Sequence, residues 1–341
     1  MSTFFTILIF LLVLLFYMHV IEEYKKSEDL EIYEMDYKSN KELQDVCNLK
    51  QPVLFNLITN EPKFFKAVDI IGESKTNVIV KDKEDIENGN VIRLPYESAK
   101  TLMTTDMKSR FYSERNDKIA GETSYDFNDM DDILKPNLVL HSKRELLFGS
   151  KGAHTVMRYH TEHRKFVAVR KGRIHVKMTP WRSGKYLHVL KDYDNYDFRS
   201  LVDVWNPQAK YANDLDKIKF LEFDVEQGYV LNVPPFWFYS IKYSSDDVTE
   251  VFELTYNTPM NVASNLPLWT MYYLQQQNLR RIFLLPFKRT DDSNKININL
   301  SDEQKQKEIY EKTPRDEVFK EQQKYKAAKK KKKEQTFTLP E

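Results

Sequence analysis

The 341-residue chain has little cysteine and little glycine: a single Cys47 and eight glycines. One cysteine excludes an internal disulfide framework and a zinc site made of several cysteines. The scarcity of glycine argues against a fold built on glycine-rich nucleotide-binding loops. A net charge of +1 gives no global electrostatic reason to expect a nucleic-acid partner. Aromatic residues, in contrast, are abundant, with 21 Phe and 20 Tyr, and they favour a β-rich interior packed with rings.

A long apolar run begins the chain. Thr3 to Ile21 contain no Lys, Arg, Asp or Glu, and as a helix they would extend about 28 Å, close to the roughly 30 Å hydrocarbon core of a bilayer. A cleaved signal peptide is the alternative, but no basic stretch precedes the run and no small-x-small cleavage site follows it. We therefore expect residues 1–21 to be an uncleaved transmembrane anchor and residues 22–31 a charged linker. Lys25 and Lys26 on its C-terminal side predict a single-pass protein whose main domain is cytosolic.

Short strands separated by turn residues dominate the middle of the chain. From about Leu138 onward, apolar and polar residues alternate in short segments that end at Gly, Pro or Asn, which is typical of antiparallel strands in a sandwich or barrel. The expected strands of this region are 139–149, 165–172, 173–180, 219–228, 229–235, 238–243 and 248–256.

The flanking segments are mixed. Strands are expected at 32–36, 52–57 and 77–81 and helices at 41–48 and 98–107, whereas the acidic segment 110–132 has the composition of a loop. Residues 265–287 have the length of a helix, and their apolar density would suit a second membrane span. Arg280, Arg281 and three consecutive glutamines favour a helix packed against the domain instead. The expected fold class is mostly β with flanking helices (α+β).

The C-terminal segment, residues 291–341, is charged and rich in lysine. From Ser301 onward it has 12 Lys and Arg against 9 Asp and Glu, and it includes the run Lys329, Lys330, Lys331, Lys332 and Lys333. This run has two interpretations. It is either part of a solvated tail or a polybasic patch that touches anionic lipid, worth about 1 kcal/mol per lysine near a membrane surface.

A succession of short segments resembles a known family. The segments are Leu147-Phe148-Gly149, the strand ending KFVAVRKG, Met178-Thr179-Pro180, VDVWNP at 202–207 and VEQGYVLNVPPFWFYSI at 225–241. Their order and spacing are similar to those of the cupin-like JmjC domains, over about Ile32 to Phe287. The resemblance implies a double-stranded β-helix (a cupin or jelly-roll barrel) at residues 32–290, in a family of oxygenases that use Fe(II) and 2-oxoglutarate.

The resemblance also implies where a metal site would lie. Such oxygenases hold Fe(II) with two histidines and one carboxylate, which leaves three coordination positions open. Members of the family place a His-x-Asp/Glu pair ahead of the strand that ends in Gly172 and a second histidine just after the Pro-x-Trp corner. Counted back from Gly172 without gaps, the pair falls on Tyr159 and Thr161, and the second histidine falls on Tyr239. The basic residue that would hold the far carboxylate of 2-oxoglutarate falls on Ile174, whereas a slip of register would bring Arg173 or His175 to this position.

A loop shorter by one residue changes this register. It brings His160 and Glu162 into the His-x-Glu positions, which are two sound ligands but not three. His160 and His163 would suit zinc if they lay on a helix, whereas in a strand or turn their rings diverge. Tyr159 and Tyr239 are expected to form hydrogen bonds across the former metal cavity.

The degenerate ligand set leads to three hypotheses. The first is a catalytically inactive barrel, with no metal or cosubstrate, that is anchored in a membrane and binds a peptide, a protein or a small ligand. The second is an Fe(II)/2-oxoglutarate-dependent hydroxylase that uses His160, Glu162 and a third ligand not evident in the sequence. The third is a structural barrel that acts as a rigid spacer.

Overall fold

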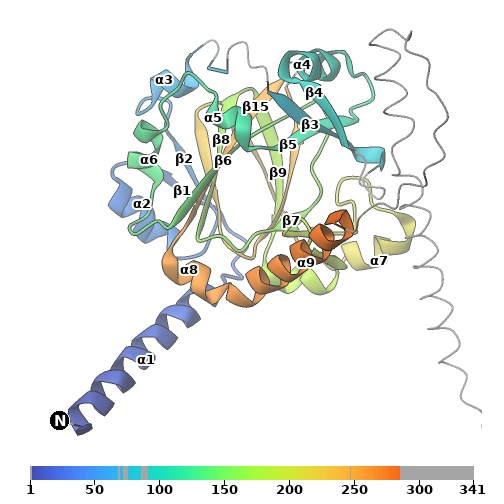
Figure 1. Ribbon diagram of the computed structural model, residues 1–341. Helices are drawn as coiled ribbons and strands as arrows, with labels where there is room; N and C mark the ends of the chain where they lie inside the picture. The colour runs from blue at the N-terminus through green and yellow to red at the C-terminus, as the bar shows by residue number, and fades with distance from the viewer. Residues whose placement is uncertain (1, 68–69, 72–75, 86–90, 246, 285–341) are drawn as a thin grey trace, which may run out of the picture. The chain divides into compact units, whose positions relative to one another are not determined.

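The computed structural model describes residues 2–67, 70–71, 76–85, 91–245 and 247–284 (Figure 1). The described part is a mixed α/β protein with two large, mainly antiparallel sheets and one long apolar helix at its N-terminus. The charged tail at 291–341, with Lys329 to Lys333, lies outside the described residues, as does the end of the 265–287 segment.

The larger sheet has nine strands in the order β1-β2-β13-β8-β15-β6-β5-β3-β4. Only β1 and β2 pair in parallel; the other described neighbours are antiparallel. Its strands are β1 (Tyr33–Asp36), β2 (Val53–Asn56), β3 (Asn77–Asp82), β4 (Val91–Pro95), β5 (Phe111–Asn116), β6 (His141–Gly149), β8 (Arg164–Lys171), β13 (Tyr229–Val233) and β15 (Thr249–Asn257).

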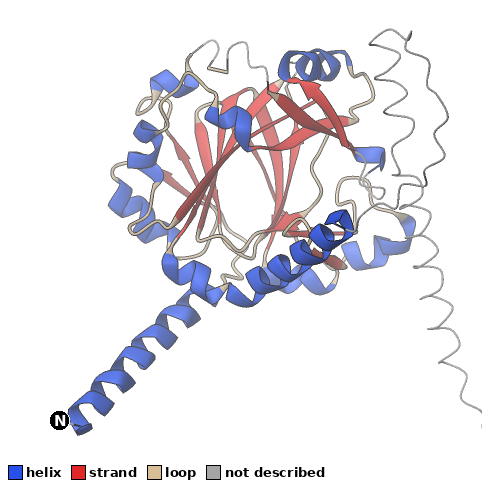
Figure 2. Cartoon of the chain, viewed as in Figure 1, coloured by secondary structure: helices blue, strands red, loops and turns tan. Residues whose placement is uncertain are grey.

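The smaller sheet has six antiparallel strands in the order β10-β11-β7-β14-β9-β12. They are β7 (Arg158–Tyr159), β9 (Arg173–Thr179), β10 (Val189–Asp192), β11 (Asp197–Ser200), β12 (Leu221–Glu226) and β14 (Phe238–Tyr243). Figure 2 shows the strands of both sheets enclosed by peripheral helices. Val167 and Leu231 of the larger sheet share one apolar cluster with Val176 and Ile241 of the smaller sheet and with the fully buried Trp237. The two sheets therefore face each other across a common core.

Eight of these strands pair in a nested pattern. β6 pairs with β15 and β8 with β13 in the larger sheet, while β7 pairs with β14 and β9 with β12 in the smaller sheet. The first of the eight strands in the sequence thus pairs with the last, the second with the second to last, and so on inwards. Successive pairs alternate between the two sheets. This places segments that are between 43 and 116 residues apart in the sequence side by side.

Helices cover the outer face of the larger sheet. Leu43, Phe64, Met103, Ile119 and Met130 extend from five helices into a cluster that also contains Phe55, Phe166 and Phe252 of the sheet. The covering helices are α2 (Asn40–Cys47), α3 (Pro62–Phe65), α4 (Tyr96–Thr105), α5 (Asp117–Gly121) and α6 (Asn128–Leu134). Local sequence explains the start of α2, where the Ser39 hydroxyl accepts a hydrogen bond from the Glu42 backbone N–H.

The remaining helices follow the last strand or lie in connections. α8 (Pro259–Ser264) begins where Thr258 caps the helix and proline occupies its first turn. α9 (Leu266–Leu284) confirms the helix expected over 265–287 as far as residue 284. The short elements are α7 (Ala212–Leu215) and three 3₁₀ turns, η1 (Lys83–Asp85), η2 (Trp181–Lys185) and η3 (Ala209–Tyr211).

The N-terminal helix α1 (Ser2–Tyr24) extends away from the sheets (Figure 1). Within the described chain it is the one helix long and apolar enough to cross a membrane, a property that a signal sequence shares, and none of its apolar window is buried. The helix continues to Tyr24, three residues past the expected end of the anchor at Ile21.

The expected strands and helices are confirmed, with shifts of a few residues at their ends, but the loop expected at 110–132 is wrong. This segment contains β5, α5 and α6. The sequence did not predict β5, because three of its buried side chains, Ser113, Glu114 and Asn116, are polar and break the apolar pattern of a strand. The two helices have only 5 and 7 residues, too few for a helical period to stand out. The short strands β4, β7, β10 and β11 were also not predicted.

Candidate functional site

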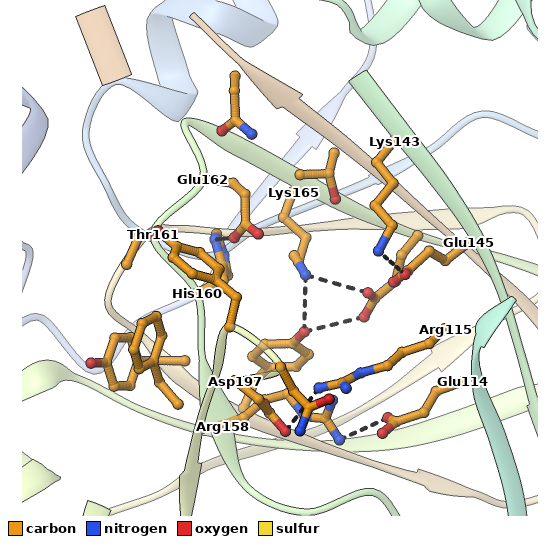
Figure 3. A pocket seen from close by; sticks show the side chains of 18 of the residues that line it. Glu114, Arg115, Lys143, Glu145, Arg158, His160, Thr161, Glu162, Lys165 and Asp197 are labelled. Atoms are coloured by element: carbon orange, nitrogen blue, oxygen red, sulfur yellow. Dashed lines mark hydrogen bonds and ion pairs between the residues drawn. The ribbon is translucent and has the colours of Figure 1, made fainter. Parts of the chain in front are cut away.

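A pocket of about 340 Å³ lies among strands of both sheets, and its lining is unusually rich in charge (Figure 3). β5, β6, β7, β8, β14 and β15 all contribute to it. Charged side chains in such a place need partners, because burying an unpaired charge is costly. The Asp, Glu, Lys and Arg side chains of the lining are Glu114, Arg115, Lys143, Glu145, Arg158, Glu162, Lys165, Asp197 and Glu253.

Lys165, Tyr239 and Glu253 form a buried hydrogen-bonded group in this pocket. The Lys165 Nζ lies 3.4 Å from Glu253 Oε2 and 3.5 Å from the Tyr239 hydroxyl, which donates to Glu253 Oε1 at 3.2 Å. The lysine and glutamate side chains are 11% and 6% exposed, and Tyr239 is 3% exposed. Three different strands, β8, β14 and β15, therefore meet at one ion pair.

The protonation states of this group follow from its surroundings. Burial lowers the pKa of Lys165, but Glu253 and Tyr239 more than compensate, and the net pKa lies well above its usual value. Burial and the neighbouring Glu253 raise the pKa of the Tyr239 hydroxyl above its usual value. Lys165 is therefore an ammonium ion, and Tyr239 is a neutral phenol.

His160 and Glu162 follow β7 and lie beside this group. The His160 side chain is 4% exposed; its Nε2 donates to the Val233 carbonyl at 2.9 Å, and its Nδ1 lies 3.0 Å from Glu162 Oε2. Neither Nδ1 nor that oxygen has a well-aligned hydrogen-bond partner among the described residues. Burial raises the pKa of Glu162, but Lys165 and His160 outweigh it and hold the net pKa well below the usual range, so this carboxyl group is ionised.

The positions that the resemblance assigns to a metal site lie in different surroundings. The Tyr159 ring stacks on Phe198 at 5.0 Å and lies edge-on to Trp181 at 5.0 Å. It makes no hydrogen bond with any described residue, so the expected bond between Tyr159 and Tyr239 is absent from this part of the chain. Thr161 Oγ1 is 3.1 Å from the Tyr196 hydroxyl. Ile174 is a fully buried core residue.

The residues present do not complete a facial triad for Fe(II). Two ligands about 2.1 Å from one metal ion and at right angles to each other would be about 3.0 Å apart, which is the separation of His160 Nδ1 and Glu162 Oε2. The residue to which the resemblance assigns the third ligand is Tyr239, and its hydroxyl is bonded to Lys165 and Glu253. Within the described residues, no group of three or more His, Cys, Asp or Glu side chains is arranged to hold a metal ion.

His160 and His163 do not form a pair either. His163 Nδ1 lies 3.1 Å from Glu23 at the end of α1, whereas the His160 ring bonds to Val233. The rings therefore diverge, as expected for residues outside a helix.

Two wall residues of the pocket have a left-handed backbone that is uncommon outside glycine. Arg115 has φ 64° and Tyr196 has φ 50°. The Arg115 guanidinium bonds Asp197 at 3.1 Å, and the Tyr196 ring stacks on Trp269 of α9 at 4.4 Å. Such conformations cost free energy and occur often at functional sites, and here both residues line the same pocket.

A buried ion-pair cluster separates this pocket from a neighbouring one of about 140 Å³. Glu114 Oε2 is 2.7 Å from Arg158, and its Oε1 is 2.5 Å from Lys81. Burial raises the pKa of Glu114, but Arg158 and Lys81 outweigh it, and the net pKa lies well below the usual range. Both pockets share this wall and the Arg115–Asp197 pair.

The end of α1 contacts the segments that build the site. Glu23 bonds His163 at 3.1 Å and accepts a hydrogen bond from Asn261 at 3.1 Å. The Tyr24 ring stacks on Phe236, with ring centroids 6.2 Å apart, and its hydroxyl donates to a backbone carbonyl of α8. Because His163 follows Glu162 directly, the apolar helix is fastened to the domain beside the pocket.

No protein-family model matches the chain, and no curated protein matches its sequence.

Lys165 and Glu253, the central ion pair, were missed as site residues in the sequence. A signal was present: Glu253 interrupts the apolar run of β15, and Lys165 stands next to an apolar segment in β8. The sequence could not predict that the two side chains lie close together, because they are 88 residues apart in the chain.

Proposed function

We propose that the chain is a membrane-anchored, double-stranded β-helix protein of the cupin-like JmjC type that acts by binding a ligand in its charged pocket. The nested pairing of β6 to β9 with β15 to β12 supports the fold. A long antiparallel ribbon wound so that successive pairs alternate between two sheets is the arrangement of a jelly roll. His160 and Glu162 follow the second strand of that ribbon, where the resemblance expects a His-x-Glu pair.

The proposal that the pocket binds a ligand and does not hold iron rests mainly on the Tyr239 hydroxyl. It occupies the position of the second histidine, it is a neutral phenol, and both its hydrogen bonds go to the Lys165–Glu253 ion pair. A neutral phenol with a raised pKa is a poor ligand for Fe(II). Ile174, in the position of the basic cosubstrate residue, offers no partner for a carboxylate.

The size and rim of the pocket support a ligand-binding role. Its volume, about 340 Å³, falls within the roughly 300–1,000 Å³ of small-molecule sites. Tyr196, Trp269 and Tyr272 form an aromatic group at one side of the lining. A small polar molecule or one peptide side chain fits a site of this size and chemistry.

The membrane part of the proposal rests on α1. It is long and apolar enough to span a bilayer, and Lys25 and Lys26 follow it, which favours a cytosolic domain. Its contacts through Glu23 and Tyr24 would hold the pocket at a fixed place relative to the membrane. Protease protection in sealed vesicles tests the orientation: the domain should be digested from the cytosolic side only.

An Fe(II)/2-oxoglutarate-dependent hydroxylase is the second candidate. The observation in its favour is the pair of buried atoms, His160 Nδ1 and Glu162 Oε2, that face each other at 3.0 Å without well-aligned partners among the described residues. Such a pair would serve as two of three iron ligands, and the third would require a rearranged pocket.

One experiment separates the two candidates. The full-length protein in detergent is supplied with Fe(II), ascorbate and 2-oxoglutarate, and succinate is measured against a no-protein control, together with bound metal. We expect no succinate above the control. Succinate formed by the wild type and lost in Glu162→Gln would refute the binding proposal and establish the hydroxylase.

A further inference from the structure

The amino group of Lys165 lies at the centre of the pocket. Its nitrogen is 3.4 Å from Glu253 and 3.5 Å from the Tyr239 hydroxyl. Figure 3 shows Lys165 on the same side of the pocket as His160 and Glu162. We infer that this ammonium is the resident cation of the pocket and keeps divalent metal ions out of it. This goes beyond the proposed function, because the role holds whatever ligand the pocket binds.

The pairing of charges in the pocket supports this role. The other cations of the lining each have a carboxylate of their own: Arg158 with Glu114, Arg115 with Asp197, and Lys143 with Glu145. Glu162 is different, since its only ion-pair partner within 4.0 Å among the described residues is His160. Burial raises its pKa, and the Lys165 charge is the strongest influence that lowers it. One ammonium therefore compensates two carboxylates, Glu162 and Glu253.

The same position explains how Lys165 would exclude a metal. A divalent ion at His160 and Glu162 would lie close to a fixed positive charge, and two further oxygen donors, on Glu253 and Tyr239, are already engaged by that charge. Without the ammonium, the His160 nitrogen and the Glu162 carboxylate, 3.0 Å apart, would face the pocket with no fixed cation beside them. These are donors that divalent transition metals accept, with water completing the coordination. The pocket thus holds two potential ligands, His160 and Glu162, beside a lysine that takes the place of a cation.

Replacing Lys165 with methionine tests the inference, because methionine has an unbranched side chain of similar length and carries no charge. The probe is Mn²⁺, titrated into tag-free, full-length protein in detergent and followed by the electron paramagnetic resonance signal of the free ion. Lys165→Met should bind one Mn²⁺ at least tenfold more tightly than the wild type. Adding Glu162→Gln to this variant should abolish the gain.

Thermal unfolding gives a second readout. Lys165→Met should lower the Tm by about 10 °C, because two buried carboxylates lose their cation, and saturating Mn²⁺ should recover at least half of that loss. Lys165→Gln is the second variant, and the same recovery is expected. Lys165→Arg keeps the charge and Lys143→Met removes a different lysine of the same pocket, so neither should gain Mn²⁺ binding.

The outcomes separate this inference from the proposed function. If neither Lys165→Met nor Lys165→Gln gains Mn²⁺ binding, or if neither folds with or without Mn²⁺, the inference is overturned and the binding function stands. If the wild type itself binds one Mn²⁺ tightly and loses it in Glu162→Gln, the inference fails and the proposed function fails with it.

Discussion

Two buried tyrosines of β14, Tyr239 and Tyr243, differ in one respect that can be measured. The Tyr239 hydroxyl bonds both Lys165 and Glu253, whereas the Tyr243 hydroxyl is buried without a hydrogen-bond partner in the described part of the chain. Replacing each with phenylalanine removes one oxygen atom and little else. The pair therefore isolates the contribution of the hydroxyl group at the central ion pair.

The magnitude follows from the groups involved. A hydrogen bond to a charged group contributes about 1.5–3 kcal/mol; the bond from Tyr239 to Glu253 is 3.2 Å long, and the one from Lys165 is 3.5 Å long and weaker. We expect Tyr239→Phe to cost about 2 kcal/mol, which lowers the Tm by about 4–8 °C for a domain of this size. Tyr243→Phe should leave the Tm unchanged or raise it, since it removes an unsatisfied polar atom.

Thermal unfolding of the full-length protein in detergent, followed by tryptophan fluorescence, measures both variants under one condition. Near-UV circular dichroism of the folded forms controls for changes in packing. Equal losses for the two variants would show that ring packing, and not the hydroxyl, matters at this strand. A loss below about 0.5 kcal/mol for Tyr239→Phe would refute the hydrogen-bonded group itself.

The anchor, the tail, a packed glycine and a buried carboxylate each give a further measurable outcome. Deleting residues 1–21 should leave a soluble, folded domain, and the full chain should resist alkaline carbonate extraction from membranes; release by carbonate would contradict an anchor. Replacing Lys329 to Lys333 with glutamine should weaken binding of that domain to anionic vesicles in low salt only; unchanged binding would favour a solvated tail. Gly149→Ala should lower the Tm, because the new carbon would lie 2.3 Å from the Tyr243 ring; an unaltered Tm would contradict this packing. The lowered pKa of Glu114 stabilises the folded state above about pH 4.3, and that stability is lost as the pH falls towards the folded-state pKa. Urea unfolding of Glu114→Gln should therefore show lower stability at pH 7 and a shallower loss in acid, and an acid profile identical to that of the wild type would count against the pairing.

The strands of the two sheets were predictable because local sequence determines where they turn. Gly172 between β8 and β9 and Gly228 between β12 and β13 have φ of +84° and +92°, which side-chain-bearing residues rarely adopt. In β9 buried residues alternate with partly exposed ones over most of the strand. Turn residues and period-two alternation are local signals, so they can be read without knowing the rest of the fold.

The central ion pair could not be predicted in the same way. Lys165 and Glu253 meet because β8 and β15 are neighbours in the larger sheet, where Thr255 lies opposite Lys165. That register depends on the winding of the whole ribbon. Tyr239 approaches the pair from the other sheet, so three strands must be placed before the group exists. A charged residue in an apolar strand signals that some partner is present, but it does not say which one.

The corner at Pro234 and Pro235 lies between His160 and Tyr239. Its hydrogen bonds determine which variant is a clean test for a metal. The Phe236 N–H donates to the His160 carbonyl at 2.9 Å, and the His160 ring donates to the Val233 carbonyl at 2.9 Å. His160 thus fastens β7 to the corner that leads into β14, a structural role that requires no metal. Loss of activity or of stability in His160→Ala would follow from the lost bond between the ring and Val233 alone. Glu162→Gln leaves both of these bonds in place and removes only the negative charge, so its effect on succinate formation or on Mn²⁺ binding bears on the metal and not on the fold.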